Sequence, residues 1–456
     1  MIRVFAVASL VVWVVLGFWP PRRPDPLPAS APADRFSAER AMVIVRAIAQ
    51  RPHPPGTDEH RRVQDWIRAA LAREGLDSSI QTGSAGGDPA ENILARMPGT
   101  ANTRAVMLAA HYDSRPEGPG ASDDGSGVAT LLETLRALRA GPRLRNDVIF
   151  LITDAEERGL IGARVFMNDH PWRHDPGVVL NFEARGTSGP SYMFETSPGN
   201  LTLIRQLQHA VPWAQASSLS YEVYRRMPND TDLTVFKRGG LNGLNFAFID
   251  HVEFYHTRFD DAAHLDLRSL QEDGRYALNL TRAFGNVDLS NVRSSYDAVY
   301  FTTLLTPLMV YPGTWAVPIA VVLLLAASAS RRIPLIIVGV LGVLCAWQVP
   351  GASYTLAWPL AGGLVGQALF LRRSLSAPVR GALIALTPAP VALILLPLIP
   401  TFTTALGLRH AWPVIVIDLA ISALCLDAAI RYCVNPRRGA RSADVSARGH
   451  SSGLLS

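Results

Sequence analysis

Hydrophobic and polar residues follow two different patterns along this chain, and the pattern changes near residue 295. Before that point, short apolar runs alternate with amphipathic stretches of helical period and with loops rich in Gly, Pro and charged residues. After it, long apolar runs dominate and are separated by clusters of arginine. Long apolar runs are typical of membrane segments, and charged, mixed sequence is typical of a soluble domain. The chain therefore predicts a large soluble domain followed by a membrane portion.

In the soluble part, the pattern predicts strands that alternate with helices. Residues 106–110 and 148–152 are short apolar runs bounded by turn signals, which is typical of buried strands. Ser37 and Thr57 can each cap the helix that follows. The alternation predicts an α/β fold, with a mostly parallel mixed sheet and helices on both of its faces. The predicted elements are helices 38–49, 58–74, 128–140, 160–168, 201–211, 232–239 and 269–284, strands 79–82, 92–97, 106–110, 148–153, 178–182 and 244–249, and short elements at 192–195 and 221–224.

The other apolar runs predict an α-helical, multi-span membrane domain. Residues 1–20 hold an apolar run after Arg3 and no clean small-x-small cleavage site, which favours an uncleaved signal anchor over a cleaved signal. The Pro-rich residues 21–35 predict a stiff, extended spacer before a soluble domain at 36–295. Residues 296–313 are apolar but short, and predict an interfacial segment. Five spans are predicted within 314–434, at 314–330, 333–349, 355–371, 381–399 and 412–431, followed by a basic cytoplasmic tail at 435–456.

Arginine clusters predict the orientation of these spans. The pair 331–332, the arginines at 372–380 and the tail lie at alternate ends of the spans, on the same side as Arg3. Arg409 and the pair 22–23 fall on the other side, but the balance favours six spans with both termini in the cytoplasm. The soluble domain of this multi-pass membrane protein is then expected outside the cytoplasm.

Charge and cysteine placement exclude several classes of partner and site. The net charge of +5 comes largely from arginines between apolar runs, which fits membrane topology. No basic patch is interleaved with aromatic residues, so no nucleic-acid partner is predicted. Cys345, Cys425 and Cys433 all lie in the apolar C-terminal part, so the soluble domain has neither a disulfide framework nor a thiolate metal site. The sequence specifies no oligomeric state.

Metal-capable side chains follow several predicted strands, at the point where each strand ends. Because the carboxyl ends of strands in an open α/β sheet converge on one crevice, these side chains are expected to meet. Imidazole and carboxylate groups together can hold a divalent cation such as zinc. Each residue alone has an ordinary explanation as a turn, a helix cap or a solvated helix start. Their shared placement favours a metal site made from His111, Asp113, Asp123, Glu156, Glu157, Glu183 and His256, with Asp124 and Asp154 expected to be structural.

Four segments carry a resemblance to a known family. The chain reads H-x-D at 111–113, G-A-x-D-D-x-S-G at 120–127, E-E-x-G-L-x-G at 156–162 and Y-H-T at 255–257. With these segments it resembles the di-zinc aminopeptidase family, metallopeptidase family 28, which implies a zinc-exopeptidase-like fold of the phosphorylase/hydrolase-like type. The segments NFEARG, NDTDLTVF, GLNFAFID, YHTRFD and VYFTTL are similar to its membrane-anchored branch, the endoplasmic reticulum metallopeptidases (Fxna-related) and vacuolar membrane proteases. The resemblance covers roughly residues 38 to 300 and, more loosely, the apolar tail.

The resemblance implies a centre of two zinc ions. The implied ligands are Asp123, bridging both ions, with His111 and Glu183 on one ion and Glu157 and His256 on the other. Glu183 stands where soluble members of the family have Asp, as in the membrane-anchored branch. The longer side chain still supplies an oxygen ligand.

The resemblance also implies catalytic roles. Asp113 would accept the imidazole hydrogen of His111 and fix its tautomer. Glu156, next to the ligand Glu157, would be the general base, because a carboxylate there can take a proton from water and return it to the leaving amine. Tyr255 is a candidate for steadying the tetrahedral oxyanion, with a packing role equally open.

These expectations lead to one preferred function and two alternatives. The preferred function is a membrane-tethered zinc aminopeptidase that hydrolyses N-terminal peptide bonds of peptide substrates outside the cytoplasm. A glutaminyl-cyclase-like acyl transferase shares the fold but uses a single zinc. The third hypothesis is a catalytically silent membrane protein that only binds peptides. No residue indicates a side-chain preference of the substrate.

Two acidic residues in the last predicted span need a separate explanation, because an ionisable group at membrane depth is costly and often functional. Asp427 can pair with Arg431, four residues further on. Asp418 has no such neighbour in the sequence. Both a place in a polar bundle interior and a functional role are open for it.

Overall fold

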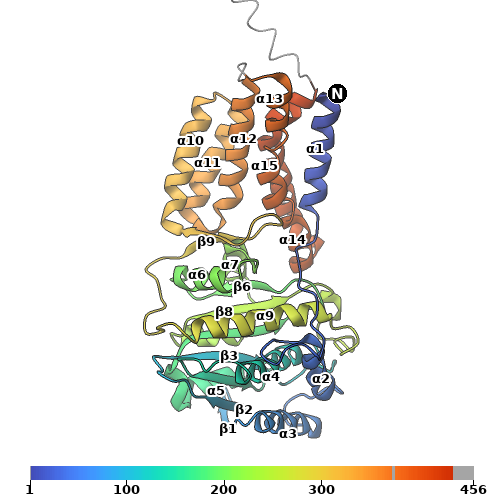
Figure 1. Cartoon of the computed structure of the whole chain (residues 1–456), viewed down its shortest axis with the longest axis vertical. Helices are drawn as coiled ribbons and strands as arrows, with labels where there is room; N and C mark the ends of the chain where they lie inside the picture. Colours follow the sequence, from blue (N-terminus) through green and yellow to red (C-terminus); the bar gives the residue numbers. More distant parts are fainter. Residues whose placement is uncertain (1, 372–374, 435–456) are drawn as a thin grey trace, which may run out of the picture. The chain divides into compact units, whose positions relative to one another are not determined.

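The computed structural model describes residues 2–371 and 375–434, which form two compact units (Figure 1). The α/β unit contains Pro21–Thr302 and Thr306–Pro312. The helical unit contains Met1–Pro20, Thr303–Leu305 and Gly313–Ser456. The tail predicted at 435–456 and the arginines at 372 and 373 lie outside the described residues.

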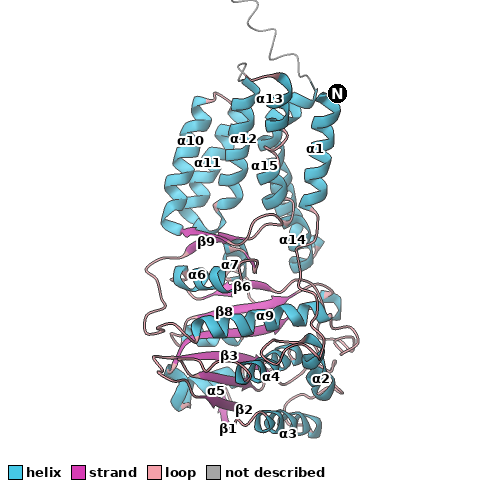
Figure 2. Ribbon diagram, viewed as in Figure 1, coloured by secondary structure: helices cyan, strands magenta, loops and turns pink. Residues whose placement is uncertain are grey.

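The α/β unit is built on a mixed sheet of eight strands (Figure 2). The strands are β1 (Ser78–Ala85), β2 (Asp88–Met97), β3 (Ala105–His111), β4 (Val148–Thr153), β5 (Pro176–Ala184), β6 (Tyr192–Thr196), β7 (Gln215–Ala216) and β8 (Gly243–Phe248), in the order β1-β2-β4-β3-β5-β8-β6-β7. The central strands β4, β3, β5 and β8 pair in parallel. Antiparallel pairs join β2 to β1 and β4 on one side and β6 to β8 on the other. The prediction of an α/β fold on a mixed sheet with a parallel centre is confirmed.

Helices cover both faces of this sheet. They are α2 (Ala38–Ile48), α3 (Asp58–Arg73), α4 (Gly125–Arg139), α5 (Ile161–Asp169), α6 (Leu201–Ala210), α7 (Ser218–Tyr224), α8 (Asp232–Arg238) and α9 (Leu267–Phe284). In β3, Val106 and Leu108 belong to one buried cluster with α2, α3, α4 and α9, whereas Met107 and Ala109 belong to a second cluster with α5 and α8. Because successive side chains of a strand point to opposite faces, the uniformly apolar run of β3 serves two helical layers at once.

Side-chain caps fix the start of the first helices, as the sequence predicts. The Ser37 hydroxyl accepts a hydrogen bond from the backbone N–H of Arg40, and the Thr57 hydroxyl accepts one from that of His60. The short element at 221–224 is the end of helix α7. The stretch predicted as an interfacial segment contains a two-stranded antiparallel sheet that the sequence did not predict, of β9 (Ala298–Phe301) and β10 (Met309–Pro312).

The Pro-rich segment expected as a spacer is bonded along α9. The Arg23 guanidinium lies 2.9 Å from a carboxylate oxygen of Asp266 and donates to the Ser269 hydroxyl at 2.7 Å. The backbone N–H of Leu27 donates to the Gln271 side chain at 2.8 Å. Directional bonds of this kind, rather than proline stiffness alone, set the course of the segment over the α/β unit.

The helical unit departs from the predicted series of six spans, because among the described residues two helices are long and apolar enough to cross a membrane. Its helices are α1 (Ile2–Gly17), α10 (Ala316–Ala329), α11 (Ile333–Gln348), α12 (Tyr354–Leu371), α13 (Ala377–Ile384), the π-helical turn Val391–Leu395, α14 (Leu398–Leu406) and α15 (Leu408–Val434). By length and composition, Pro350–Leu371 and His410–Asp427 could cross a membrane, and the other apolar helices are shorter. The stretch predicted as a span at 381–399 is not one helix, because Pro388, Pro390 and Pro397 remove backbone donors from it.

Candidate metal centre

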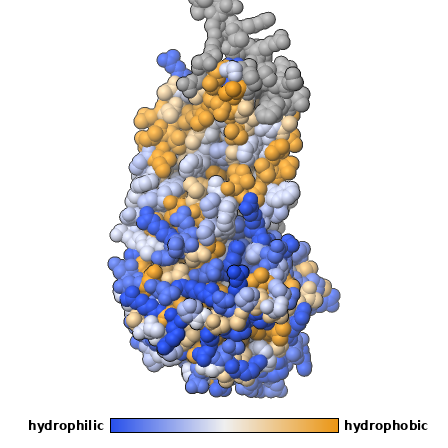
Figure 3. All heavy atoms as spheres, viewed as in Figure 1, coloured by the Kyte–Doolittle hydropathy of each residue, from blue (hydrophilic) through white to orange (hydrophobic). Residues whose placement is uncertain are grey.

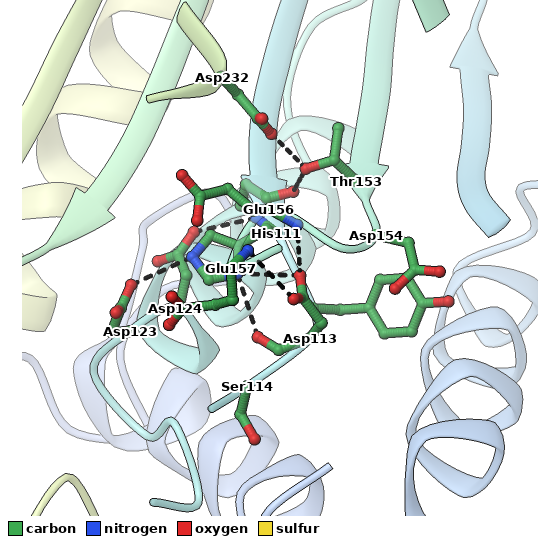
Figure 4. A network of polar contacts seen from close by, with 12 residues as sticks. His111, Asp113, Ser114, Asp123, Asp124, Thr153, Asp154, Glu156, Glu157 and Asp232 are labelled. Atoms are coloured by element: carbon green, nitrogen blue, oxygen red, sulfur yellow. Dashed lines mark hydrogen bonds and ion pairs between the residues drawn. The ribbon is translucent and has the colours of Figure 1, made fainter. Parts of the chain in front are cut away.

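The predicted metal ligands meet at the carboxyl end of the central strands. His111, Asp123 and Glu157 are labelled in Figure 4. His111 is the last residue of β3, and Glu183 lies next to the last residue of β5. Glu157 follows β4, Asp123 lies in the loop that leads into α4, and His256 lies in the loop after β8. Residues that are far apart in the sequence are thus placed together by the parallel centre of the sheet.

Asp123 lies between the two histidines. Its Oδ1 is 3.1 Å from Nε2 of His111, and its Oδ2 is 3.2 Å from Nε2 of His256. Each imidazole also faces a glutamate: Nε2 of His256 is 3.0 Å from Oε1 of Glu157, and Nε2 of His111 is 3.8 Å from Oε2 of Glu183. The ligand atoms therefore form two groups that share the Asp123 carboxylate.

Asp124 lies beside the same groups but is already engaged. Its carboxylate falls within 4.8 Å of ligand atoms of His111 and Glu183. One of its oxygens accepts the backbone N–H of His111 at 3.1 Å, and the other accepts that of Gly127 at 2.9 Å, which caps α4. The peptide bond that joins Asp123 to Asp124 is cis. These bonds engage both oxygens of Asp124, and Asp123 faces both histidines. The structural role expected of Asp124 stays a prediction.

Asp113 ties the end of β3 to the loop after β4. Its two carboxylate oxygens accept the backbone N–H groups of Glu156 and Glu157, at 3.0 and 3.3 Å. Nδ1 of His111 lies 3.1 Å from the Asp113 backbone carbonyl and 3.4 Å from its Oδ1. Acceptors on the Nδ1 side hold the ring so that Nε2 faces Asp123, which is the arrangement that a metal-binding imidazole needs.

Buried negative charge is in excess at this site. Burial, together with the charge of Asp123, raises the pKa of Glu183 to about 8 and that of Glu157 to about 7. Burial also raises the pKa of Glu156 well above its ordinary value. Against the effect of burial, hydrogen bonds from His111 and His256 hold the pKa of Asp123 below its ordinary range. Among the described residues, Arg115 is the cationic side chain paired with this set, 3.9 Å from an oxygen of Glu157. A buried set of several carboxylates and two imidazoles fits divalent cations, which would supply further positive charge.

The Glu156 carboxylate makes no hydrogen bond or ion pair among the described residues, and its backbone N–H donates to Asp113. The side chain is half-buried, so water has access to it. Tyr255 stacks on His256, with ring centroids 3.7 Å apart, and burial raises the pKa of its hydroxyl. The general-base role of Glu156 and the oxyanion role of Tyr255 stay predictions.

The part of the chain that contains this site is similar to a known protein family. A family model described as Peptidase family M28 matches residues 92–281. The chain carries a peptidase M28 domain. That domain contains the strands and loops that supply His111, Asp123, Glu157, Glu183 and His256.

Relatives of the M28 domain include membrane proteins of eukaryotes. Endoplasmic reticulum metallopeptidase 1 of Rattus norvegicus is 31% identical over 258 residues, which is 54% of this chain and 29% of the relative. Vacuolar membrane protease of Candida dubliniensis is 28% identical over 274 residues, which is 56% of this chain and 29% of the relative. The chain spans less than a third of the length of each of these two proteins.

Solved structures similar to this chain include an aminopeptidase and a glutaminyl cyclase. An aminopeptidase from Aneurinibacillus sp. strain AM-1 superposes with a TM-score of 0.47 at 12% identity, over 55% of this chain and 94% of that one. Porphyromonas gingivalis glutaminyl cyclase superposes with a TM-score of 0.46 at 23% identity, over 54% of this chain and 97% of that one.

Two acidic residues of the M28 domain were not singled out from the sequence. Asp260 is buried and accepts the backbone N–H groups of Ser122 and Asp123, at 2.6 and 3.2 Å, so it joins the His256 loop to the Asp123 loop. Asp232, at the start of α8, accepts the Thr153 hydroxyl at 2.5 Å. Both lie in segments that carried the family resemblance, YHTRFD and NDTDLTVF, and that was the available signal. By contrast, Asp154 pairs with His60 at 2.8 Å, as expected for a structural residue.

Proposed function

We propose that the M28 domain is a zinc-dependent aminopeptidase that holds two zinc ions. The observation that carries this proposal is the placement of Asp123, whose two carboxylate oxygens each face Nε2 of a different histidine. A carboxylate in that position can serve two cations at once, and paired cations about 3.5–4 Å apart recur in aminopeptidases. Glu183 and Glu157 add one further ligand on each side.

Different residues bind the metal ions, transfer the proton and position these groups. His111 and Glu183 would hold one ion and Glu157 and His256 the other, with Asp123 shared. Zinc at this position supplies Lewis acidity to a peptide carbonyl and makes water more acidic. Glu156 takes a proton from the attacking water on its carboxylate and returns it to the leaving amine. Asp113 keeps the backbone of Glu156 and the ring of His111 in place, so base and ligand stay in fixed relation.

Replacement of the base tests the proposal. We expect Glu156→Gln to reduce hydrolysis of aminoacyl substrates by roughly 100-fold or more, because general-base catalysis is typically worth about 10²–10⁴ in rate. Zinc content should stay near that of the unmodified chain, since the Glu156 side chain makes no hydrogen bond or ion pair with any of the proposed ligands among the described residues. Glu74→Gln, at the half-exposed end of α3, is the matched control. Loss of zinc together with activity would make Glu156 a ligand and overturn the assignment.

Metal stoichiometry separates this proposal from the two alternatives. A glutaminyl-cyclase-like enzyme would hold one zinc ion per chain at saturation and would cyclise peptides with N-terminal glutamine. A silent peptide-binding protein would show no chelator-sensitive hydrolysis of any aminoacyl substrate. Two ions per chain, with hydrolysis that chelator removes and zinc restores, is the result expected here.

The helical unit is the membrane anchor in this proposal. Large apolar side chains are exposed along α10 and α11, such as Val322 (64%), Leu325 (66%), Ile333 (71%) and Trp347 (70%), and apolar surface extends over this unit in Figure 3. Exposed apolar area of this extent is typical of a surface that faces lipid. The arginine pattern supports an orientation with both termini in the cytoplasm and the M28 domain outside it. A reporter fused near residue 290 that is active only in the cytoplasm would contradict this orientation.

A further inference from the structure

Helix α15 presents one face to the interior of the helical unit, and Asp418 lies on that face. Between Ala411 and Ala429 the buried side chains recur at intervals of three, four or seven residues, as expected for one side of a helix. Trp412, Ile417 and Leu419 are half or more exposed on the other side. The residues of the buried face are Ala411, Asp418, Ser422, Cys425 and Ala429.

The buried face of α15 packs closely against α12. A Cβ atom built on Gly363 of α12 would lie 2.9 Å from the backbone oxygen of Cys425. Only glycine therefore fits at this contact, and the two backbones approach each other there, two helical turns beyond Asp418. Asp418 is 4% exposed and Ser422, one turn on, is 6% exposed. Both side chains are thus enclosed by helices.

The polar atoms of this pair have no hydrogen-bonding partner. Both carboxylate oxygens of Asp418 and the hydroxyl of Ser422 are buried without a partner among the described residues. Such groups are rare, because an unpaired buried polar atom is costly, and each calls for an explanation such as a ligand. Here three unpartnered oxygens lie within one turn of one helix face.

Among the described residues, no cationic side chain forms an ion pair with Asp418. Within α15, Arg409 lies about 13 Å away along the helix axis, and Arg431, about 20 Å away, already pairs with Asp427. Of the elements packed against α15, the helices α11, α12 and α14 and the π-helical turn contain no Asp, Glu, Lys, Arg or His. Their titratable residues are Cys345 and Tyr354, and α1 adds Arg3 in its first turn. Helix α13, whose Ile384 shares a buried cluster with Ala429 of α15, contains Arg380.

The number of unpartnered oxygens at Asp418 and Ser422 limits which ion can bind there. Hard metal cations take roughly six to eight oxygen ligands, and three oxygens are too few for them. A proton needs one carboxylate oxygen, and the neutral acid suits apolar surroundings better than the carboxylate does. Asp418 also lies at the middle of the span His410–Asp427, where an uncompensated charge is least tolerated.

We propose that Asp418 is a proton-binding site inside the helical unit. The site takes up one proton from water on a carboxylate oxygen and releases it to water again, so the unit changes by one charge. This proposal rests on the insertion of the helical unit in a bilayer and not on the peptidase activity.

Carbodiimide labelling of the full chain in lipid nanodiscs tests the proposal. Dicyclohexylcarbodiimide is apolar and reacts with protonated carboxyl groups, and peptide mass spectrometry locates the product. We expect it to label Asp418 and to spare Asp427, which is paired with Arg431. Labelling should fall about tenfold for each unit of pH above the midpoint of the titration. A water-soluble carbodiimide should not label Asp418. Absence of label between pH 5 and pH 9, or label that does not change with pH, would overturn the proposal.

Matched variants separate the site from the fold. Asp418→Asn should abolish the label at this position, whereas Asp427→Asn should leave labelling of Asp418 unchanged. Ser422→Ala should leave the label on Asp418 in place, because the Ser422 hydroxyl makes no hydrogen bond among the described residues. Hydrolysis of aminoacyl substrates should be unaffected by Asp418→Asn. Alkaline extraction of cell membranes tests insertion separately: a chain that is extracted fails the anchor proposal, whatever its labelling.

Discussion

Replacement of Asp113 by Asn tests whether a single carboxylate holds the metal centre together. The carboxylate accepts two backbone N–H groups, those of Glu156 and Glu157. An amide offers only one acceptor oxygen, and its NH₂ group would face the second N–H. One partly buried donor then loses its partner, which costs about 1–3 kcal/mol, and the other bond loses its charge assistance. We expect a total loss of about 2–3 kcal/mol in the free energy of unfolding.

The expected loss can be measured in two ways. For a domain of this size, about 2–3 kcal/mol corresponds to a fall of roughly 4–12 °C in the thermal unfolding midpoint. Removing a residue that orients a metal-binding histidine typically weakens metal affinity by about 10–100-fold. Zinc affinity is measured by competition with a chromophoric chelator, using the full chain in detergent. Asp58→Asn is the control, because the Asp58 side chain is 98% exposed at the start of α3.

Two outcomes would contradict the role proposed for Asp113. If Asp113→Asn and Asp58→Asn bind zinc with the same affinity and unfold at the same temperature, the bonds to Glu156 and Glu157 do not hold the site. A fall in the unfolding midpoint without a change in zinc affinity would also count against it. Asp113 would then support the fold and not orient His111.

Three further predictions concern the same site. Without metal, the free energy of unfolding should fall as pH rises from about 4.3, the ordinary carboxyl pKa, to about 8. Burial raises the pKa of Glu157 to about 7 and that of Glu183 to about 8, so over this range the folded state keeps protons that the unfolded state has lost. Unfolding midpoints of the chelated chain that rise with pH over this range would contradict the prediction. Asp260→Ala should weaken zinc binding by about 10–100-fold, measured as above. Asp261→Ala is the control: this neighbouring side chain is 34% exposed, and its replacement should leave zinc affinity unchanged. Tyr255→Phe keeps the stacking on His256, so a fall of about 100-fold in kcat with little change in KM indicates oxyanion stabilisation, and an unchanged kcat leaves Tyr255 a packing role.

Burial on both faces explains why the central strands were predictable. Every residue of β3 and of β4 is buried, so these strands are uninterrupted apolar runs with clear ends. Two of the predicted metal ligands, His111 and Glu157, lie at or soon after those ends, because the position of a strand's carboxyl end fixes where its next residues lie. The parallel pairing of β3 with β4 and β5 then brings the ligands together without any signal specific to the site.

Features that depend on long-range bonds were not predictable in the same way. Asp260 acts through the backbone of residues more than 130 positions earlier, and no local pattern marks such a partner. Helix α7 begins at a serine cap within a stretch of mixed residues, so its periodicity is weak. In the helical unit, the hydropathy of residues 381–399 resembles that of a span. The three prolines, which interrupt the helix, carry little weight in such a pattern.

The ligands on the two sides of Asp123 are held by elements of different rigidity. His111 and Glu183 extend from strands in the middle of the sheet, whereas Glu157 and His256 sit on loops. Loops open at a much lower free energy than central strands do. Of two bound ions, the one on the loop side should therefore exchange more quickly with the surrounding solution. A chain that gradually loses zinc would pass through a form with one ion, retained by the strands, before it loses both.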